Sequence, residues 1–145
     1  MNIQRLQALA TFLRTVPQRH FDLQSWRSSA DGDEEVTDAD LASLHCGTTA
    51  CAVGWACSLP EFQAQGLTWG TDENYTGGYP IFTLPDMPDY HSGWNAVEEF
   101  FDISYPTAEY LFSADEYPEV YPGMATSATA VADRIEKVIA PGSME

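Results

Sequence analysis

The sequence contains no lysine or arginine from Ser28 to Asp133, although this stretch holds nineteen of its twenty-two aspartate and glutamate residues. The six cationic side chains lie at the two ends of the chain, as Arg5, Arg14, Arg19, Arg27, Arg134 and Lys137. Any fold must therefore keep many like charges at the surface with few opposite charges to offset their repulsion. A net charge of −16 on 145 residues also exceeds the modest charge that solubility needs. We expect the central part of the chain to present an almost purely negative surface.

The composition is nevertheless typical of a folded protein. Hydrophobic residues make up 44% of the chain, with seven Phe, seven Tyr and four Trp, whereas acidic disordered chains are poor in aromatic residues. A length of 145 residues fits a single acidic, α-rich domain over residues 1–145. The absence of Lys and Arg clusters argues against direct binding to nucleic acid or to an anionic membrane.

The sequence also bears on the compartment. No apolar run is long enough to span a membrane, and the N-terminus lacks the continuous apolar core of a signal peptide. Three cysteines, an odd number, do not form a disulfide framework. We therefore expect a cytoplasmic protein, in the host cytoplasm if a phage encodes it.

Hydrophobic spacing and capping residues predict a mainly α fold, a single compact domain of about five helices with a small β-hairpin. Asn2 is a suitable cap for a first helix that ends before Pro17, and Thr126 or Ser127 for a last helix that ends before Pro141. Apolar residues recur at helical spacing in the first helix, at Ile3, Leu6, Leu9, Ala10, Leu13 and Val16. The runs 67–69 and 79–84 are typical of strands and flank a turn-rich segment, which predicts the hairpin.

Three further helices are predicted between these ends. Residues 48–57, with Thr48 as the cap, form a buried central helix because they are apolar on all sides, and Gly54 would let another backbone approach closely. Ser92 caps the next helix, and Pro106 lies in the first turn of the one after it. Residues 28–41 are strongly polar and are interpreted as a solvated acidic loop.

The segment from His45 to Cys57 invites three interpretations. One histidine and three cysteines are a permitted zinc set, but their spacing matches no common ligand pair, and on one helix Cys51 and Cys57 would point to different sides. Cys46 and Cys51 could instead form a redox pair, with the pKa of Cys51 lowered by a position in the first helical turn. The interpretation we favour is that Cys51 and Cys57 are small buried hydrophobes.

The same segment also resembles a motif found in other proteins. Residues 46–56, CGTTACAVGWA, followed by Pro60, Glu61 and Phe62, resemble a motif of a family of small uncharacterised proteins from bacteriophages and bacteria. The likeness extends loosely to the N-terminal helix and to residues 110–113. The family has no settled activity, so the resemblance implies an intracellular, phage-related setting and assigns no catalytic residue.

The remaining patterns in the sequence do not meet the requirements of a calcium site or of a catalytic histidine. A calcium loop starting at Asp31 would need Gly in place of Val36 and Glu in place of Ala42. His20 and His91 have no nucleophile motif beside them. We therefore assign no catalytic residue, no metal ligand and no cofactor.

The acidic excess has two explanations, adaptation to high salt and partner binding. Adaptation to salt would not require every cation to lie near the ends of the chain, so we favour binding. The hypothesis is a non-enzymatic, acidic protein-binding protein, a phage-encoded inhibitor that imitates the charge of nucleic acid and blocks a basic, nucleic-acid-binding host protein such as a defence protein. The alternative is a small thiol- or metal-dependent enzyme centred on Cys46 and Cys51.

The hypothesis names two sets of residues. The acidic partner-binding residues are Asp31, Asp33, Glu34, Glu35, Asp38, Asp40, Glu98, Glu99, Asp102, Asp115, Glu116 and Glu119. The aromatic residues proposed as anchors are Tyr75, Tyr90, Tyr105, Tyr117 and Tyr121.

Overall fold

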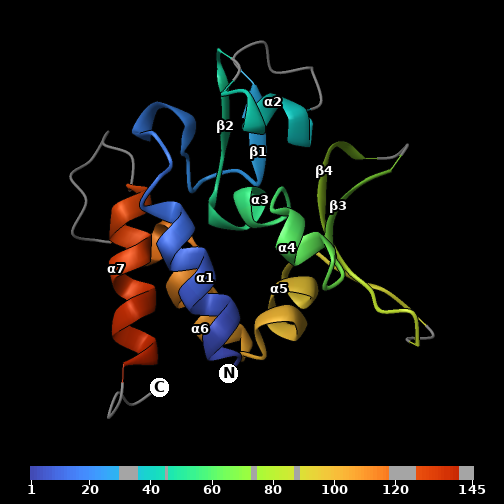
Figure 1. The fold of residues 1–145 in the computed structure, drawn as a ribbon, viewed down its shortest axis with the longest axis vertical. Helices are drawn as coiled ribbons and strands as arrows, with labels where there is room; N and C mark the ends of the chain where they lie inside the picture. Colours follow the sequence, from blue (N-terminus) through green and yellow to red (C-terminus); the bar gives the residue numbers. More distant parts are fainter. Residues whose placement is uncertain (30–35, 45, 73–74, 87–88, 118–126, 141–145) are drawn as a thin grey trace.

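The computed structural model describes residues 1–29, 36–44, 46–72, 75–86, 89–117 and 127–140. The two longest of its helices, α1 (Ile3–Leu13) and α7 (Ala128–Ile139), come from opposite ends of the chain and pack side by side (Figure 1). Asn2 Oδ1 accepts a hydrogen bond from the backbone N–H of Arg5, and Ser127 Oγ accepts one from Ala130. Both predicted caps are therefore confirmed.

The packed faces of these helices follow the predicted spacing. The buried residues of the pair are Leu6, Leu9, Ala10, Leu13, Ala128, Val131, Ala132 and Ile135. Ile3, which was expected to face the core, is 53% exposed. Val16 lies after the end of α1 and packs partly buried against the core.

Helices α5 (Trp94–Phe101) and α6 (Tyr105–Phe112) follow one another and are in contact. Ser104 caps α6, and Pro106 lies in its first turn as predicted. The prediction that Ser92 caps α5 was wrong, because Ser92 belongs to a strand and Gly93 precedes the helix with φ 59°. Helix α5 is followed by Asp102, which adopts the left-handed conformation and caps the helix.

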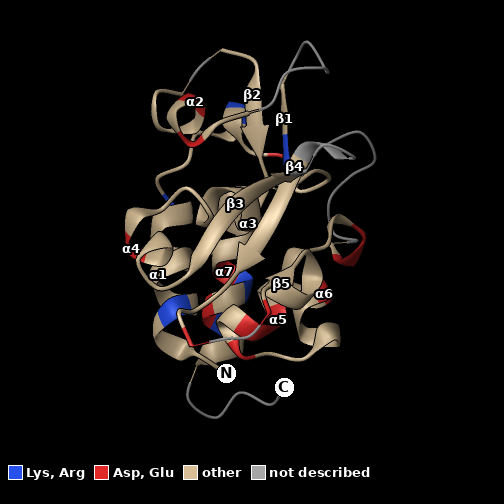
Figure 2. Cartoon of the chain, turned by 90° about the vertical axis from the view of Figure 1, so that its right-hand side faces the viewer, with Lys and Arg blue, Asp and Glu red and all other residues tan. Residues whose placement is uncertain are grey.

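The predicted hairpin is confirmed and is longer than expected. Strands β3 (Leu67–Asp72) and β4 (Tyr75–Phe82) pair antiparallel, with Leu67 opposite Phe82 and an irregularity between Gly70 and Asp72. Strand β5 (His91–Ser92) extends the sheet in the order β3-β4-β5. The hairpin contacts α5 and α3, and Figure 2 shows it crossing the face of the molecule.

A second small sheet was not predicted. Strands β1 (Arg27–Ser29) and β2 (Thr48–Ala50) pair antiparallel, with Ser28 opposite Thr49. Between them lies helix α2 (Asp38–Ala42), which begins with a capping box formed by Thr37 and Asp40. The interpretation of 28–41 as one solvated loop was therefore wrong at both of its ends; residues 30–35 lie outside the described part.

The central helix is shorter than predicted. Helix α3 spans Ala52–Ala56, and Thr48 lies in β2 rather than at a helix cap. Pro60 opens a further short helix, α4 (Pro60–Gln63). All five residues of α3 are buried, so the expectation of a buried centre is confirmed.

One hydrophobic core joins these elements. Its middle is a cluster of edge-to-face aromatic rings formed by Phe62, Phe82, Phe100 and Phe101. Within the described ranges the chain forms seven α-helices, two short 3₁₀ helices, η1 (Gln18–His20) and η2 (Ala114–Glu116), and two small antiparallel sheets. The mainly α class is supported, with more helices and one more sheet than expected. Among the helices of these ranges, none has the length and apolar character that crossing a membrane requires.

Candidate functional site

The cysteine segment folds into the middle of the core. Cys51 directly precedes α3, and its Sγ accepts a hydrogen bond of 3.4 Å from the backbone N–H of Gly54. Cys51 and Cys57 are buried, whereas Cys46 is exposed. The sulfur of Cys51 therefore replaces the usual hydroxyl or carboxylate cap of a helix.

The thiols of this segment are poorly suited to chemistry. Burial raises the pKa of the Cys51 thiol to about 11, and burial also raises the pKa of Cys57. The expected lowering at Cys51 was wrong, because loss of water outweighs the backbone hydrogen bonds that favour the thiolate. In the part of the chain that the structure describes, no group of three or more His, Cys, Asp or Glu side chains could hold a metal ion; His45 lies outside that part.

These environments predict a selective pattern of alkylation. At about pH 8 iodoacetamide should modify Cys46 in the folded protein and leave Cys51 and Cys57 intact, because only exposed thiols with an accessible thiolate react quickly. Mass spectrometry should show one modified thiol before denaturation and three afterwards. A Cys46→Ser variant provides the control and should remain unmodified while folded. Modification of native Cys51 at the rate of Cys46 would restore the thiol-enzyme alternative.

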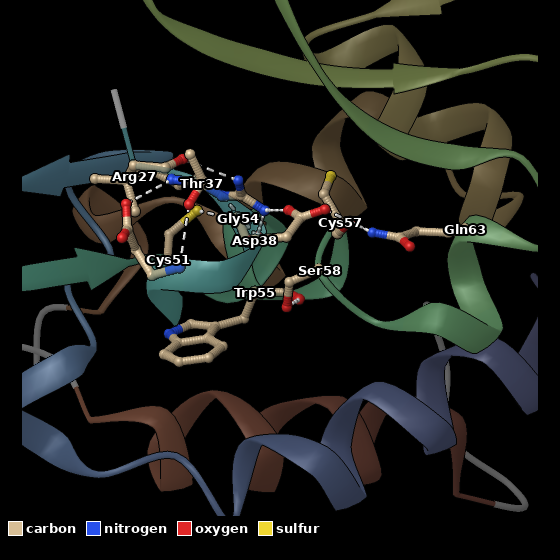
Figure 3. Close-up of polar contacts among 11 residues, drawn as sticks. Arg27, Thr37, Asp38, Cys51, Gly54, Trp55, Cys57, Ser58 and Gln63 are labelled. Carbon is tan, nitrogen blue, oxygen red and sulfur yellow. Dashed lines mark hydrogen bonds and ion pairs between the residues drawn. The ribbon is translucent and has the colours of Figure 1, made fainter. Parts of the chain in front are cut away.

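Arg27 is the centre of a polar network beside α3 (Figure 3). Its Nε and Nη2 donate to the carbonyl oxygen of Gly54 at 3.2 and 3.1 Å, and its Nη1 donates to Val36 at 3.1 Å. Nη2 also pairs with Asp38 Oδ1 at 2.7 Å, and Gln63 Nε2 donates to Asp38 Oδ2 at 2.8 Å. The network therefore ties β1, α2, α3 and α4 together.

The remaining residues of the CGTTACAVGWA segment also act through packing. A Cβ on Gly54 would overlap the carbonyl oxygen of Trp26, so the predicted close approach of another backbone is confirmed. Trp55 Nε1 donates to the carbonyl oxygen of His20 at 3.0 Å. The segment thus joins β1, η1 and α3, and its distinctive residues have structural roles.

The predicted acidic residues separate into two groups. Asp38 and Asp40 lie on α2, near the top of Figure 2, and their carboxylates make internal contacts with Arg27, Gln63 and the backbone of Thr37. Helices α5 and α6 lie in contact in the lower half of the same view, and η2 follows α6 and contacts it. They carry what we call the α5–η2 acidic surface, formed by Glu98, Glu99, Asp102, Asp115 and Glu116. The other predicted residues, Asp31, Asp33, Glu34, Glu35 and Glu119, lie outside the described part.

The side chains of the α5–η2 acidic surface face water. Glu99, Asp102, Asp115 and Glu116 are exposed, which confirms the outward direction predicted for Glu99 and Asp102, whereas Glu98 is partly buried. Asp102 pairs with the amino group of Met1 at 3.0 Å, yet its side chain remains 83% exposed. These carboxylates therefore remain accessible to a partner.

Three of the arginines, Arg5, Arg27 and Arg134, make contacts within the fold, whereas Arg14, Arg19 and Lys137 are exposed. Arg5 donates to the carbonyl oxygen of Phe100 at 2.8 Å and lies 4.1 Å from the centre of its ring. Arg134 donates to two carbonyl oxygens and lies 4.2 and 3.7 Å from the ring centres of Tyr110 and Tyr117. Within the described ranges, arginine forms ion pairs with three carboxylates, those of Asp38, Asp133 and Glu136. Arg5, Arg27 and Arg134 therefore stabilise the fold, and in the described part of the chain arginine pairs with few of the exposed carboxylates.

A groove of about 560 Å³ opens next to the acidic surface. It lies between the chain entering β1, strand β4, the start of α5 and the end of α6, and its lining includes Leu23, Trp26, Gly78, Trp94, Phe112 and Asp115. The rings of Trp26 and Trp94 are 5.2 Å apart at their centres and inclined by 56°. We call this the Trp26–Trp94 groove. Sequence reasoning missed it because its lining comes from five separate segments, 23–27, Cys51, Gly78, Trp94 and 112–115, which only the fold brings together.

Tyr105 lies beside the groove, and its ring centre is 6.1 Å from that of Trp94. Of the other proposed tyrosine anchors, Tyr90 is 60% exposed, whereas Tyr117 is buried and donates to the carbonyl oxygen of Leu111. Tyr117 was therefore wrongly proposed as an anchor. Tyr121 and the side chain of Tyr75 lie outside the described part of the structure.

Comparisons with protein-family models, with curated proteins and with solved structures give no match to this chain. The resemblance of the CGTTACAVGWA segment to phage and bacterial proteins therefore stays a prediction. The function must be argued from the charges and the geometry of this chain.

Proposed function

We propose that this protein is a non-enzymatic binding protein that docks the α5–η2 acidic surface on a basic, nucleic-acid-binding surface of another protein. The finer proposal is a phage-encoded inhibitor that occupies the site where its target would bind nucleic acid. The observation that carries the proposal is the contrast in placement. Arg5, Arg27 and Arg134 are turned toward carbonyl groups of the fold, while Glu99, Asp102, Asp115 and Glu116 are exposed.

Charge placement of this kind suits fast association with a basic partner. Unneutralised charges on one surface steer an oppositely charged protein toward it and raise the association rate. Duplex DNA carries one phosphate per roughly 3.4 Å along each strand, and neighbouring helical side chains are spaced by about 5–6 Å. The long Lys and Arg side chains of a nucleic-acid-binding site can accommodate this difference.

The environment of the cysteines counts against the enzymatic alternative. A nucleophilic cysteine needs an accessible thiolate, but Cys51 is buried and its pKa is raised to about 11. Cys46 is exposed while Cys51 is not, so the two thiols do not share one accessible site.

The proposal is tested by capturing partners from a bacterial lysate on the immobilised protein at low salt. We expect the retained proteins to be basic nucleic-acid-binding proteins that duplex DNA and salt both elute, because exposed charges are screened over about 8 Å at physiological ionic strength. The retained protein is then purified, and its association with the parent and with variants is measured by surface plasmon resonance.

Charge removal on the acidic surface should slow this association. The variant Glu98→Gln/Glu99→Gln/Asp102→Asn is expected to associate about 3- to 10-fold more slowly at low salt. Its melting temperature should be equal or higher, because the fall in like-charge repulsion outweighs the loss of the exposed ion pair between Asp102 and the Met1 amino group. Asn is also well tolerated at the left-handed position of Asp102.

A variant with the same change in net charge at other places is the matched control. Glu61→Gln/Asp133→Asn/Glu136→Gln removes three charges from α4 and α7, and α7 lies on the far side of α1 from α5 in Figure 1. Asp133 and Glu136 pair with Arg14, so the melting temperature of this variant is measured alongside its association rate. It should slow association much less than the α5 variant. Equal slowing by both variants would show that net charge alone acts, and equal rates for parent and α5 variant would remove this surface from the proposal.

A further inference from the structure

We infer that the Trp26–Trp94 groove receives an arginine or lysine side chain from the basic partner protein. This inference rests on the proposed function, since it names how that partner is anchored beside the acidic surface. The groove supplies the three features that such a side chain needs: aromatic faces, an apolar floor and a carboxylate.

The aromatic faces come from two tryptophans. Trp26 and Trp94 are both partly buried and both line the groove, and their inclined rings stand 5.2 Å apart at the centres. A cation over the face of an indole ring is attracted by the ring quadrupole, most strongly for Trp among the aromatic residues. Within the described part of the chain neither indole N–H donates a hydrogen bond, so both also remain available to a partner's backbone.

The apolar floor is provided by Leu23 and Phe112, which are both buried. Arginine and lysine carry a long methylene stem that gains from contact with apolar surface while the charged end stays near polar groups. A volume of about 560 Å³ lies within the usual range for small-ligand sites of ~300–1,000 Å³. The groove therefore has room for one long side chain together with the backbone on either side of it.

The charge in the groove favours a cation. Helix α5 begins at the groove with the positive end of its dipole, and helix α6 ends there with the negative end of its dipole. Each end is equivalent to about half a unit charge, so the two largely cancel. Arg27 also lines the groove, but its guanidinium is paired with Asp38. The exposed carboxylate of Asp115 is left as the uncompensated charge.

The test uses capped tripeptides as probes and the intact protein labelled with ¹⁵N. Gly-Arg-Gly and Gly-Lys-Gly are titrated in parallel with Gly-citrulline-Gly, which has almost the shape of the arginine peptide but no charge. The four indole N–H resonances, assigned through single Trp→Phe variants, report separately on the groove and on Trp55 and Trp69. We expect saturable shifts at Trp26 and Trp94 with a Kd in roughly the millimolar range, and binding of the citrulline peptide at least about fivefold weaker.

Two single variants that should not disturb the fold complete the test. Asp115 is exposed, so the Asp115→Asn variant should keep the spectrum of a folded protein. Its affinity for the arginine peptide should fall about threefold or more, and its affinity for the citrulline peptide should not change. Glu61→Gln, with the same change in charge on α4, should leave both affinities unchanged. Equal binding of charged and neutral peptides would show a general apolar groove, and absent shifts at Trp26 and Trp94 would show no site; each result overturns the inference.

The failure of this inference and the failure of the proposed function are distinguishable. If basic proteins are captured through α5 but no peptide shifts the groove resonances, the inference fails and the function stands. If arginine peptides bind the groove but no basic protein is captured, the proposed function fails while the groove remains a cation site. Only agreement of both experiments supports one surface with an anchoring groove.

Discussion

Gly54→Ala is expected to destabilise the protein strongly, although alanine is the better helix former. A Cβ at this position would overlap the carbonyl oxygen of Trp26 and lie 3.1 Å from Ala50 Cβ. The carbonyl cannot move freely, because it accepts the backbone N–H of Cys51 at 3.1 Å. Overpacking of a core usually costs about 1–3 kcal/mol and more where backbone must shift. We expect a loss at the upper end of that range for alanine and a larger loss for leucine, measured by urea denaturation.

Helix propensity alone predicts that Gly54→Ala stabilises the protein, so the sign of the measured change in stability separates the two explanations. Gly→Ala in an unobstructed helix interior stabilises by roughly 0.5–1 kcal/mol. A variant of Gly54 that is more stable than the parent would therefore show that β1 does not lie against α3 as described. Replacement of Cys51 by Ser is a local control, because serine keeps a capping atom for Gly54 and should leave stability within about 1 kcal/mol of the parent.

The helices that sequence reasoning placed correctly are those with local signals. Asn2 and Ser127 cap α1 and α7, and apolar residues at helical spacing mark their buried faces. Both signals depend only on residues within a few positions of each other. The start of α3 was misplaced because a segment that is apolar on every side has no periodicity to fix its register or its ends.

The β1–β2 sheet had no local signal at all. Its strands are three residues each, contain Arg, Ser and Thr, and pair across about twenty residues of intervening chain. Short polar strands are stabilised by what packs on them rather than by their own propensity. Here Gly54 and Arg27 provide that packing, so the sheet could be found only with the fold known.

Some features of the candidate site could likewise be predicted from local sequence and others could not. The outward direction of Glu99 and Asp102 was predictable from the helical face opposite Val97 and Phe101. The internal contacts of Asp38 and Asp40 were not, since they depend on Arg27 and on the capping box of α2. The Trp26–Trp94 groove could not be predicted because it joins residues as far apart in the chain as Leu23 and Asp115.

Arg27→Met is expected to destabilise the protein by about 3–5 kcal/mol, because removing one partner of a buried polar network leaves the others unsatisfied. The side chain of Arg27 is fully buried, and it donates to the carbonyl oxygens of Gly54 and Val36. Asp38 contributes less to the loss, since its side chain is 45% exposed and can be solvated. Calorimetry or urea denaturation of the variant measures the change.

Two companion variants separate the hydrogen bonds of Arg27 from its charge. Arg27→Lys keeps the charge but cannot donate to Gly54, Val36 and Asp38 together, so it should recover only part of the lost stability. Asp38→Asn removes the ion pair and keeps both carbonyl contacts, so it should cost much less than Arg27→Met. If Arg27→Lys were as stable as the parent, charge alone would hold this region. Such a result would mean that the pairing of β1 with β2 and the contact of Cys51 N–H with the Trp26 carbonyl, not the guanidinium fork, set the position of Trp26 in the groove.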